Sequence, residues 1–285
     1  MSVDKLQNKI RKLKNPSMVM FSLDSSVIPS AYRTTDNEIS NYLCYANALL
    51  AAMKDTVPAV RFDFGTFAVT GTEGLAALAE LLNEASVLGY YVLLDIPAMH
   101  TPNGAVIAAE QIAKNWKFDG LLLNAYIGSD GVKPFAEHLT TSEADLFLLL
   151  RTANKTASEI QDLLTGTRLV YTVVADMAKR LGEDLLARCG YSRIAGVGPA
   201  TSADTLQQLR AKYPAMFLLI DGYDYSGANA KNCSMAFDKF GHGAIACTGD
   251  SVVGAWREEN GDPVELAVLA AEKMKKNLTR YVDIL

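Results

Sequence analysis

Short apolar runs alternate with longer amphipathic stretches along almost the whole chain, and this alternation limits the folds that the chain can adopt. Eight runs are brief, apolar and bounded by turn residues or polar ends, as strands buried on both faces of a parallel sheet are. They span residues 18–23, 59–64, 90–96, 120–124, 145–151, 194–197, 216–220 and 244–247. The alternation therefore indicates an α/β fold with a parallel sheet.

Between these runs the apolar residues follow helical spacing. Helices are predicted over residues 73–88, 105–114, 157–164, 169–187 and 203–212. Eight strands separated by helices favour a closed (β/α)8 (TIM) barrel, with an open doubly wound sheet as the alternative. Barrels of this kind form one domain of this length, so we expect a single domain over residues 1–285.

The first 15 residues predict a short helix that covers one end of the barrel. Leu6, Ile10 and Leu13 recur at helical spacing, among charged residues. This segment has no apolar core of the kind that secretory signals carry. No run approaches the roughly 18 apolar residues that a membrane span requires. We therefore expect a cytoplasmic protein without a membrane partner.

Composition and residue spacing argue against several classes of partner and cofactor. The formal net charge is −5, so the chain offers no basic surface for nucleic acid. The four cysteines are far apart and the three histidines show no ligand spacing, which argues against a disulfide framework or a metal site. We expect a small-molecule ligand and neither a metal nor an organic cofactor.

Charged residues lie at the carboxyl ends of the predicted strands, where barrels of this class have their active sites. Arg61 and Asp63 end the second strand and Asp95 ends the third. Since these strands are neighbours in the predicted barrel, the three side chains are expected to form a charged cluster. Such a cluster can serve a reaction, or it can only satisfy its own buried charges.

Several strand ends resemble one enzyme family. Residues 122–130 (Leu-Leu-Asn-Ala-Tyr-Ile-Gly-Ser-Asp) with Lys133-Pro-Phe135, and residues 148–154 (Leu-Leu-Leu-Arg-Thr-Ala-Asn) with residues 159–163, resemble the strand-four and strand-five segments of bacterial orotidine 5′-phosphate decarboxylases. Weaker matches occur in order at residues 23–24, 71–75, 222–223 and 236–238. The resemblance extends from about Met18 to about Val253.

The resemblance implies a homodimeric barrel that acts on a pyrimidine nucleotide without a metal or an organic cofactor. In that family a lysine follows strand two and a D-x-K-x-x-D motif follows strand three. One carboxylate disfavours the ground state beside the substrate carboxylate, and a lysine stabilises and protonates the developing carbanion. Fixed charges in a dry cavity can lower a barrier by many kcal/mol.

The family's catalytic positions map onto Asp95, Arg61 and His100. Asp95 keeps the first carboxylate, and Arg61 takes the strand-two lysine position. His100 replaces the second carboxylate, which in the family reaches into the partner subunit's site. The matching substrate-binding candidates are Asp24, Asn124, Ser129, Asp130, Arg151, Thr152, Gly222 and Tyr223.

Structural roles are open alternatives for several of these candidates. Asp24 and Asp95 contact a ribose hydroxyl or cap a loop. The stretch that contains Asn124 and Asp130 lines a pocket or only forms a turn. Arg151 lines the pocket or forms an ion pair with a neighbouring acid.

The motif after strand three departs from the family pattern. It reads Asp95-Ile-Pro-Ala-Met-His100, so Pro97, with Ala98 beside it, stands at the lysine position. Proline carries no charge and no backbone N–H. Arg61 cannot replace the lysine as a proton donor because a guanidinium keeps its proton.

The end of the site that would bind phosphate is altered as well. Ser226 stands at the family's glutamine position after strand seven, and Asp224 is added nearby. Asp250 stands where the family has an arginine after strand eight. A carboxylate repels a phosphate dianion by about 1 kcal/mol at 4 Å in water and by more when desolvated.

The departures from the family pattern change the function that we expect, and they leave alternatives open. We expect an orotidine 5′-phosphate decarboxylase-like protein whose decarboxylation is impaired or lost, because Pro97, His100 and Asp250 replace key charged residues. The alternatives are a non-catalytic sensor or partner of an active paralogue, and a repurposed barrel enzyme acting on a non-phosphorylated small molecule. The ligand would be a pyrimidine nucleotide or a less anionic relative.

Overall fold

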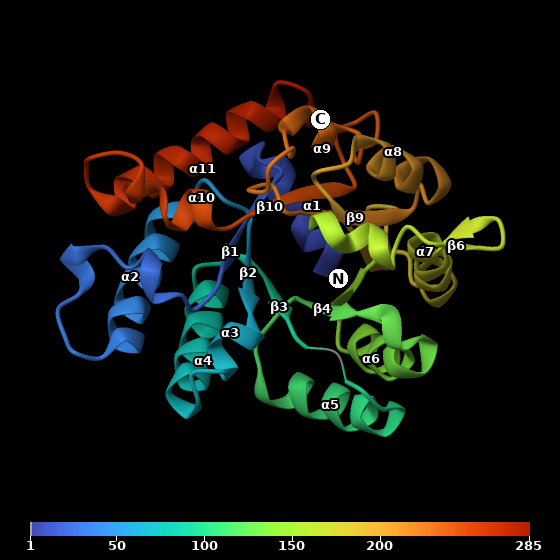
Figure 1. The fold of residues 1–285 in the computed structure, drawn as a ribbon, viewed down its shortest axis with the longest axis horizontal. Helices are drawn as coiled ribbons and strands as arrows, with labels where there is room; N and C mark the ends of the chain where they lie inside the picture. The colour runs from blue at the N-terminus through green and yellow to red at the C-terminus, as the bar shows by residue number, and fades with distance from the viewer. Residues whose placement is uncertain (1, 98) are drawn as a thin grey trace.

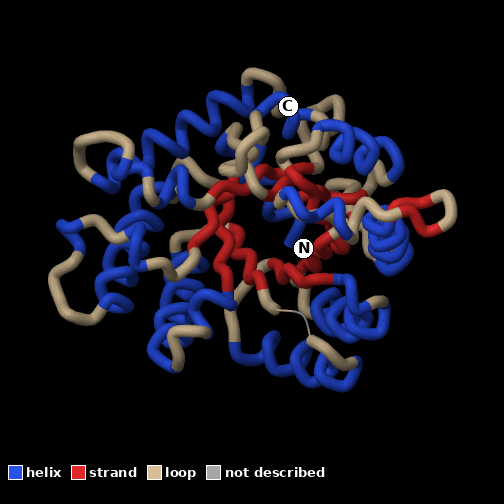
Figure 2. The backbone as a smooth tube through the Cα atoms, viewed as in Figure 1, coloured by secondary structure: helices blue, strands red, loops and turns tan. Residues whose placement is uncertain are grey.

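The computed structural model describes residues 2–97 and 99–285 and contains a closed barrel of eight parallel strands. Around the barrel the strands follow the order β1-β10-β9-β8-β5-β4-β3-β2. Figure 2 shows the strands as a central ring with helices around it. The strands are β1 Ser17–Phe21, β2 Ala59–Asp63, β3 Tyr91–Asp95, β4 Gly120–Asn124, β5 Asp145–Leu149, β8 Ser192–Pro199, β9 Met216–Asp221 and β10 Ala244–Thr248. The predicted (β/α)8 barrel is confirmed.

The strands lie at or close to the positions that the sequence predicts, because each is an almost continuous apolar segment buried on both faces. Polar residues end several of them. In the register of β2 and β3, Asp63 is the partner of Asp95, and Pro199 of β8 is the partner of Asp221 in β9. The carboxyl ends of the strands thus bring acidic residues to one level, the barrel mouth.

The helices surround this ring (Figure 1). The longer ones are α1 Ser2–Leu13, α2 Glu38–Met53, α4 Thr72–Val87, α5 Pro102–Asn115, α6 Ser129–Thr141, α7 Val170–Leu181, α8 Ala203–Lys212 and α11 Pro263–Thr279. Three short helices follow strands: α3 Phe64–Ala68, α9 Ala230–Ser234 and α10 Asp250–Val253. The predicted helices at 73–88, 105–114 and 203–212 are confirmed, and the one predicted at 169–187 ends early, at Leu181.

The helix predicted at 157–164 is wrong. A short 3-10 helix, Lys155–Glu159, leads instead into a hairpin of β6 Leu164–Thr165 and β7 Arg168–Leu169. The hairpin turn contains Gly166 with φ of 65°, a left-handed conformation that ends helical geometry. Figure 1 shows this hairpin projecting beside α7.

The N-terminal helix α1 covers the amino end of the barrel, as predicted. Val3, Leu6 and Ile10 are fully buried. Lys5 pairs with Asp119, directly before β4, and the backbone N–H of Gly243, directly before β10, donates to Gln7. Because this end is covered, the ligand site is expected at the mouth. Across the described ranges, no helix has both the length and the apolar character needed to cross a bilayer.

Candidate functional site at the barrel mouth

A buried arginine at the mouth is held between two carboxylates from other strands. Arg61, near the end of β2, donates to Asp95 Oδ2 through Nη2 at 2.5 Å and through Nε at 3.2 Å. Its Nη1 donates to Asp221 Oδ1 at 2.9 Å. The Arg61 side chain is only 9% exposed, whereas Asp95 and Asp221 remain 20% and 28% exposed. We call these three residues the Arg61 cluster.

Burial and neighbouring charges set the protonation of the Arg61 cluster. Although burial disfavours the charged guanidinium, Asp221 and Asp95 raise the pKa of Arg61 well above its usual value. Burial also raises the pKa of Asp95; Arg61 opposes this shift, and the carboxylates of Asp63 and Asp221 add to it. One cation thus pairs with two carboxylates, at the ends of β3 and β9, while the Asp63 carboxylate accepts from the backbone N–H of Gly65. Of the predicted cluster of Arg61, Asp63 and Asp95, the pair Arg61–Asp95 is confirmed, and Asp63 acts on Asp95 only as a nearby like charge.

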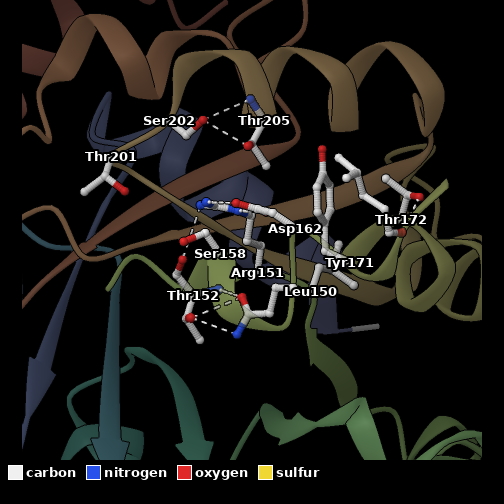
Figure 3. A network of polar contacts seen from close by, with 12 residues as sticks. Leu150, Arg151, Thr152, Ser158, Asp162, Tyr171, Thr172, Thr201, Ser202 and Thr205 are labelled. Atoms are coloured by element: carbon white, nitrogen blue, oxygen red, sulfur yellow. Dashed lines mark hydrogen bonds and ion pairs between the residues drawn. The ribbon is translucent and has the colours of Figure 1, made fainter. Parts of the chain in front are cut away.

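The second arginine at the mouth is paired as well. Arg151, which follows β5, donates through Nε and Nη2 to the two carboxylate oxygens of Asp162, both at 2.7 Å (Figure 3). The hydrogen bond from Arg151 lowers the pKa of Asp162 below its usual value. Next to this pair, the backbone N–H of Thr152 donates to Gln161 at 2.8 Å. Of the two alternatives for Arg151, the ion pair with a neighbouring acid is therefore the one that the structure shows.

The loop after β9 carries a carboxylate to the end of β10. Asp224 accepts a hydrogen bond from Thr248 Oγ1 at 2.5 Å and another from the backbone N–H of Gly249 at 2.6 Å. Gly222 allows this loop to turn: its φ is 79°, and an added Cβ would lie 2.4 Å from the Cβ of Ala153. The predicted candidate Gly222 is therefore a position where only glycine fits.

The other acid of this corner points to a different partner. Asp250, at the start of α10, forms an ion pair with Arg257. Tyr223 lines a cleft of about 630 Å³ with α11 residues such as Met274, and the hydrogen bonds of Arg61 go to Asp95 and Asp221, not to Tyr223.

The remaining candidates lie in loops and at helix starts around the mouth. Asp24 accepts from the backbone N–H of Ser26, and Asn124 accepts from that of Tyr126, so both cap short 3-10 helices. Ser129 and Asp130 begin α6, where Ser129 is half-buried and Asp130 exposed. Within the described parts of the chain, these four residues form no hydrogen bond or ion pair with the Arg61 cluster.

The positions predicted to replace the family's strand-three motif are exposed. Pro97 and His100 both lie on the surface after β3, and Ala98 lies outside the described residues. The structure therefore brings together Arg61 and Asp95 of the three predicted catalytic residues, and leaves His100 apart from them.

Two residues of the mouth were not predicted from the sequence as site residues. Asp221 completes the Arg61 cluster, and Asp162 holds Arg151. A signal existed for Asp221, because it ends β9 as Asp95 ends β3. Asp162 lies within the strand-five segment that resembles the family, but spacing alone did not show which side chain it meets. Among the described residues, no three His, Cys, Asp or Glu side chains are grouped so that they could hold a metal ion.

The barrel topology and its charged mouth place the chain among the parallel (β/α)8 barrels. Similar solved structures include a putative orotidine-monophosphate decarboxylase from Toxoplasma gondii, with a TM-score of 0.81 and 20% identity, covering 98% of this chain and 97% of that one. A putative orotidine 5′-phosphate decarboxylase from Streptomyces avermitilis gives a TM-score of 0.79 at 20% identity, covering 98% and 95% of the two chains. These likenesses support the fold.

Sequence comparison gives the family resemblance. No protein-family model matches the chain. Orotidine 5′-phosphate decarboxylase of Clostridium novyi (strain NT) is 26% identical over 284 residues, covering 98% of both chains. The enzyme of the same name from Clostridium perfringens (strain 13 / Type A) is 28% identical over 294 residues, covering 99% of both. The resemblance predicted from the strand ends is confirmed: the chain is similar to proteins named orotidine 5′-phosphate decarboxylase over nearly its whole length.

Proposed function

We propose that this chain is an orotidine 5′-phosphate decarboxylase-like protein in which decarboxylation is strongly impaired or lost. The near full-length similarity to enzymes of that name supports a place in pyrimidine nucleotide metabolism. The pairing of the mouth arginines carries the second half of the proposal. Arg61 is bound by Asp95 and Asp221, and Arg151 is bound by Asp162.

The barrel strands supply few cations. None of the eight strands contains a lysine, and Arg61 and Arg193 are their basic residues. Arg193 lies near the amino end of β8, where it donates to the carbonyl of Ala144, far along the strand from the mouth. Arg61 is therefore the one strand cation placed at the mouth.

The chemistry of decarboxylation makes this shortage important. When CO₂ leaves, the electron pair of the broken bond stays on the substrate carbon, which must be stabilised and then protonated. Preorganised positive charge supplies the stabilisation, and a lysine can supply the proton. Arg61 keeps its proton and already donates to two carboxylates. Arg61 is thus not suited to deliver the proton.

The test is an assay of orotidine 5′-monophosphate decarboxylation with protein purified from a host deleted for its own enzyme. The deletion is essential because traces of an efficient enzyme would dominate the signal. We expect no turnover above that of a mock purification from the same host. Turnover that disappears in Arg61→Ala would show that the charged array has been rebuilt around Arg61, and it would refute the proposal.

Among the alternatives, one observation favours a barrel that acts on a non-phosphorylated molecule. The carboxylate of Asp224 accepts hydrogen bonds from Thr248 and Gly249, and so places a negative charge beside them at the end of β10. In barrels of this class a phosphate often binds between the loops after strands seven and eight. A non-catalytic sensor or a partner of an active paralogue would show no turnover of any substrate, so a survey of unphosphorylated substrates separates the two.

The proposal includes a cytoplasmic homodimer with one domain over residues 1–285 and no cofactor. The resemblance places the residue at the His100 position across the dimer interface. Shortly after His100, α5 begins, and Val106 and Ile107 of this helix expose 53% and 55% of their surface. Exposed apolar side chains next to the mouth support an interface at this place.

A further inference from the structure

The end of β10 is the part of the mouth where a barrel of this class would bind a phosphate. Such sites commonly lie between the loops after the seventh and eighth strands, which are β9 and β10 here. Thr248 Oγ1 lies 2.7 Å from the hydroxyl of Ser251. Two donors found at this place are the hydroxyl of Thr248 and the backbone N–H of Gly249. Both donate to Asp224, so an anion supplied by the protein itself already holds them.

The charges near Asp224 do not compensate a second anion. Within the described part of the chain Asp224 makes no ion pair, and it accepts hydrogen bonds from neutral donors only. Arg257, the arginine of this corner, is bound to Asp250. A phosphate at this place would lose both donors to Asp224 and would meet its carboxylate at short range, where like charges repel.

The other side of the mouth offers acceptors. Arg61 bonds to Oδ2 of Asp95 and to Oδ1 of Asp221. The second oxygen of each carboxylate has no hydrogen bond within the described residues, and both side chains remain partly exposed. Carboxylate oxygens accept hydrogen bonds from hydroxyl groups, so this side of the mouth suits a ligand that presents hydroxyls, such as a ribose.

We propose that Asp224 is a specificity-determining residue that excludes phosphorylated ligands, and that the mouth accepts an unphosphorylated, hydroxyl-bearing molecule of the nucleoside class. This inference rests on the proposed function for the nucleoside class. The part that concerns Asp224 stands on the geometry at β10 alone.

The experiment compares the wild-type protein with Asp224→Ala and Asp224→Asn. Inorganic phosphate, uridine and uridine 5′-monophosphate are the probes, and isothermal titration calorimetry measures their binding. Asp224→Ala frees Thr248 and Gly249 and removes the charge, whereas Asp224→Asn removes the charge at nearly constant shape. Asp55→Ala is the control, because Asp55 is exposed in the turn before β2, at the opposite end of the barrel.

We expect wild type and Asp55→Ala to bind uridine more tightly than uridine 5′-monophosphate and to give no heat with phosphate. In Asp224→Ala, affinity for phosphate and for uridine 5′-monophosphate should rise at least about tenfold, with a smaller gain in Asp224→Asn, since freed donors and a removed negative charge both favour an anion. Circular dichroism establishes that each variant is folded.

The outcomes separate the two parts of the inference. If neither folded variant gains phosphate binding, or if wild type prefers the monophosphate, Asp224 does not exclude phosphate and the proposal is overturned. If phosphate binding appears in Asp224→Ala but no protein binds uridine, the role of Asp224 stands and the nucleoside class is wrong. Turnover of orotidine 5′-monophosphate by wild type would instead refute the proposed function, whatever the phosphate titrations give.

Discussion

The side chain of Arg61 is a cation at the barrel mouth, and its contacts with two carboxylates decide what it can do there. The resemblance predicts a lysine at its position, and the planar guanidinium of Arg61 contacts Asp95 and Asp221 instead of offering a free ammonium group. Ionic contacts of this kind satisfy buried charge at a large desolvation cost. Removing the arginine would leave the carboxylates without their counter-charge.

At the residue scale we therefore expect Arg61→Ala to destabilise the fold by about 3 kcal/mol, the lower end of the cost of breaking a buried ion pair. The lower end applies because Asp95 and Asp221 are partly exposed, so that water can solvate their charges. Urea-induced unfolding at neutral pH measures the change. Replacing Lys133, whose ion pair with Glu137 on α6 is exposed, is the control and should cost less than about 1 kcal/mol. Equal losses in the two variants would contradict a structural role for the Arg61 cluster.

At the scale of elements, the strands could be predicted from the sequence and the connection from β5 to α7 could not. A strand buried on both faces is a continuous apolar run, which is a local property. The connection 150–169 instead depends on the pairing of Arg151 with Asp162 and of Thr152 with Gln161. Spacing predicted a helix at 157–164 because it does not reveal which side chains meet. Spacing does not indicate Asp221 as a site residue either, because its partner Arg61 is 160 positions away in the chain.

The pairing of Arg151 with Asp162 predicts a pH dependence of stability. Arg151 lowers the pKa of folded Asp162, so the stabilisation is present above the unfolded pKa of about 3.9 and is lost as the pH falls through the lower folded value. Asp162→Asn should therefore be less stable than wild type at about pH 7, with the difference shrinking below about pH 4. Urea unfolding across this range measures it.

The control for this prediction is Asp36→Asn. Asp36 is exposed and, within the described residues, has no ion pair. Its replacement should leave the pH profile of stability close to that of wild type. A wild-type advantage over Asp162→Asn that stays constant down to about pH 2 would show that the ion pair does not cause the effect.

At the scale of the whole molecule, the proposed dimer depends on α5. Ile107→Glu would place a charge on an exposed apolar side chain of this helix, and burying that charge in an interface is unfavourable. We expect this variant to sediment as a monomer while wild type sediments as a dimer. Leu269 on α11 is equally exposed, at 58%, so Leu269→Glu is the control and should leave the dimer intact. A dimer that persists in Ile107→Glu would move the interface elsewhere.

Both chain ends lie on the covered side of the barrel. Arg11 donates to the carbonyl of Leu285 and Lys14 to that of Ile284, and Leu285 also donates to Phe240, which precedes β10. The mouth opens at the far end of the strands. A tag, a dye or a solid support attached through either end would therefore leave the ligand entrance unobstructed, so the immobilised protein could be used to screen compound libraries without masking the site.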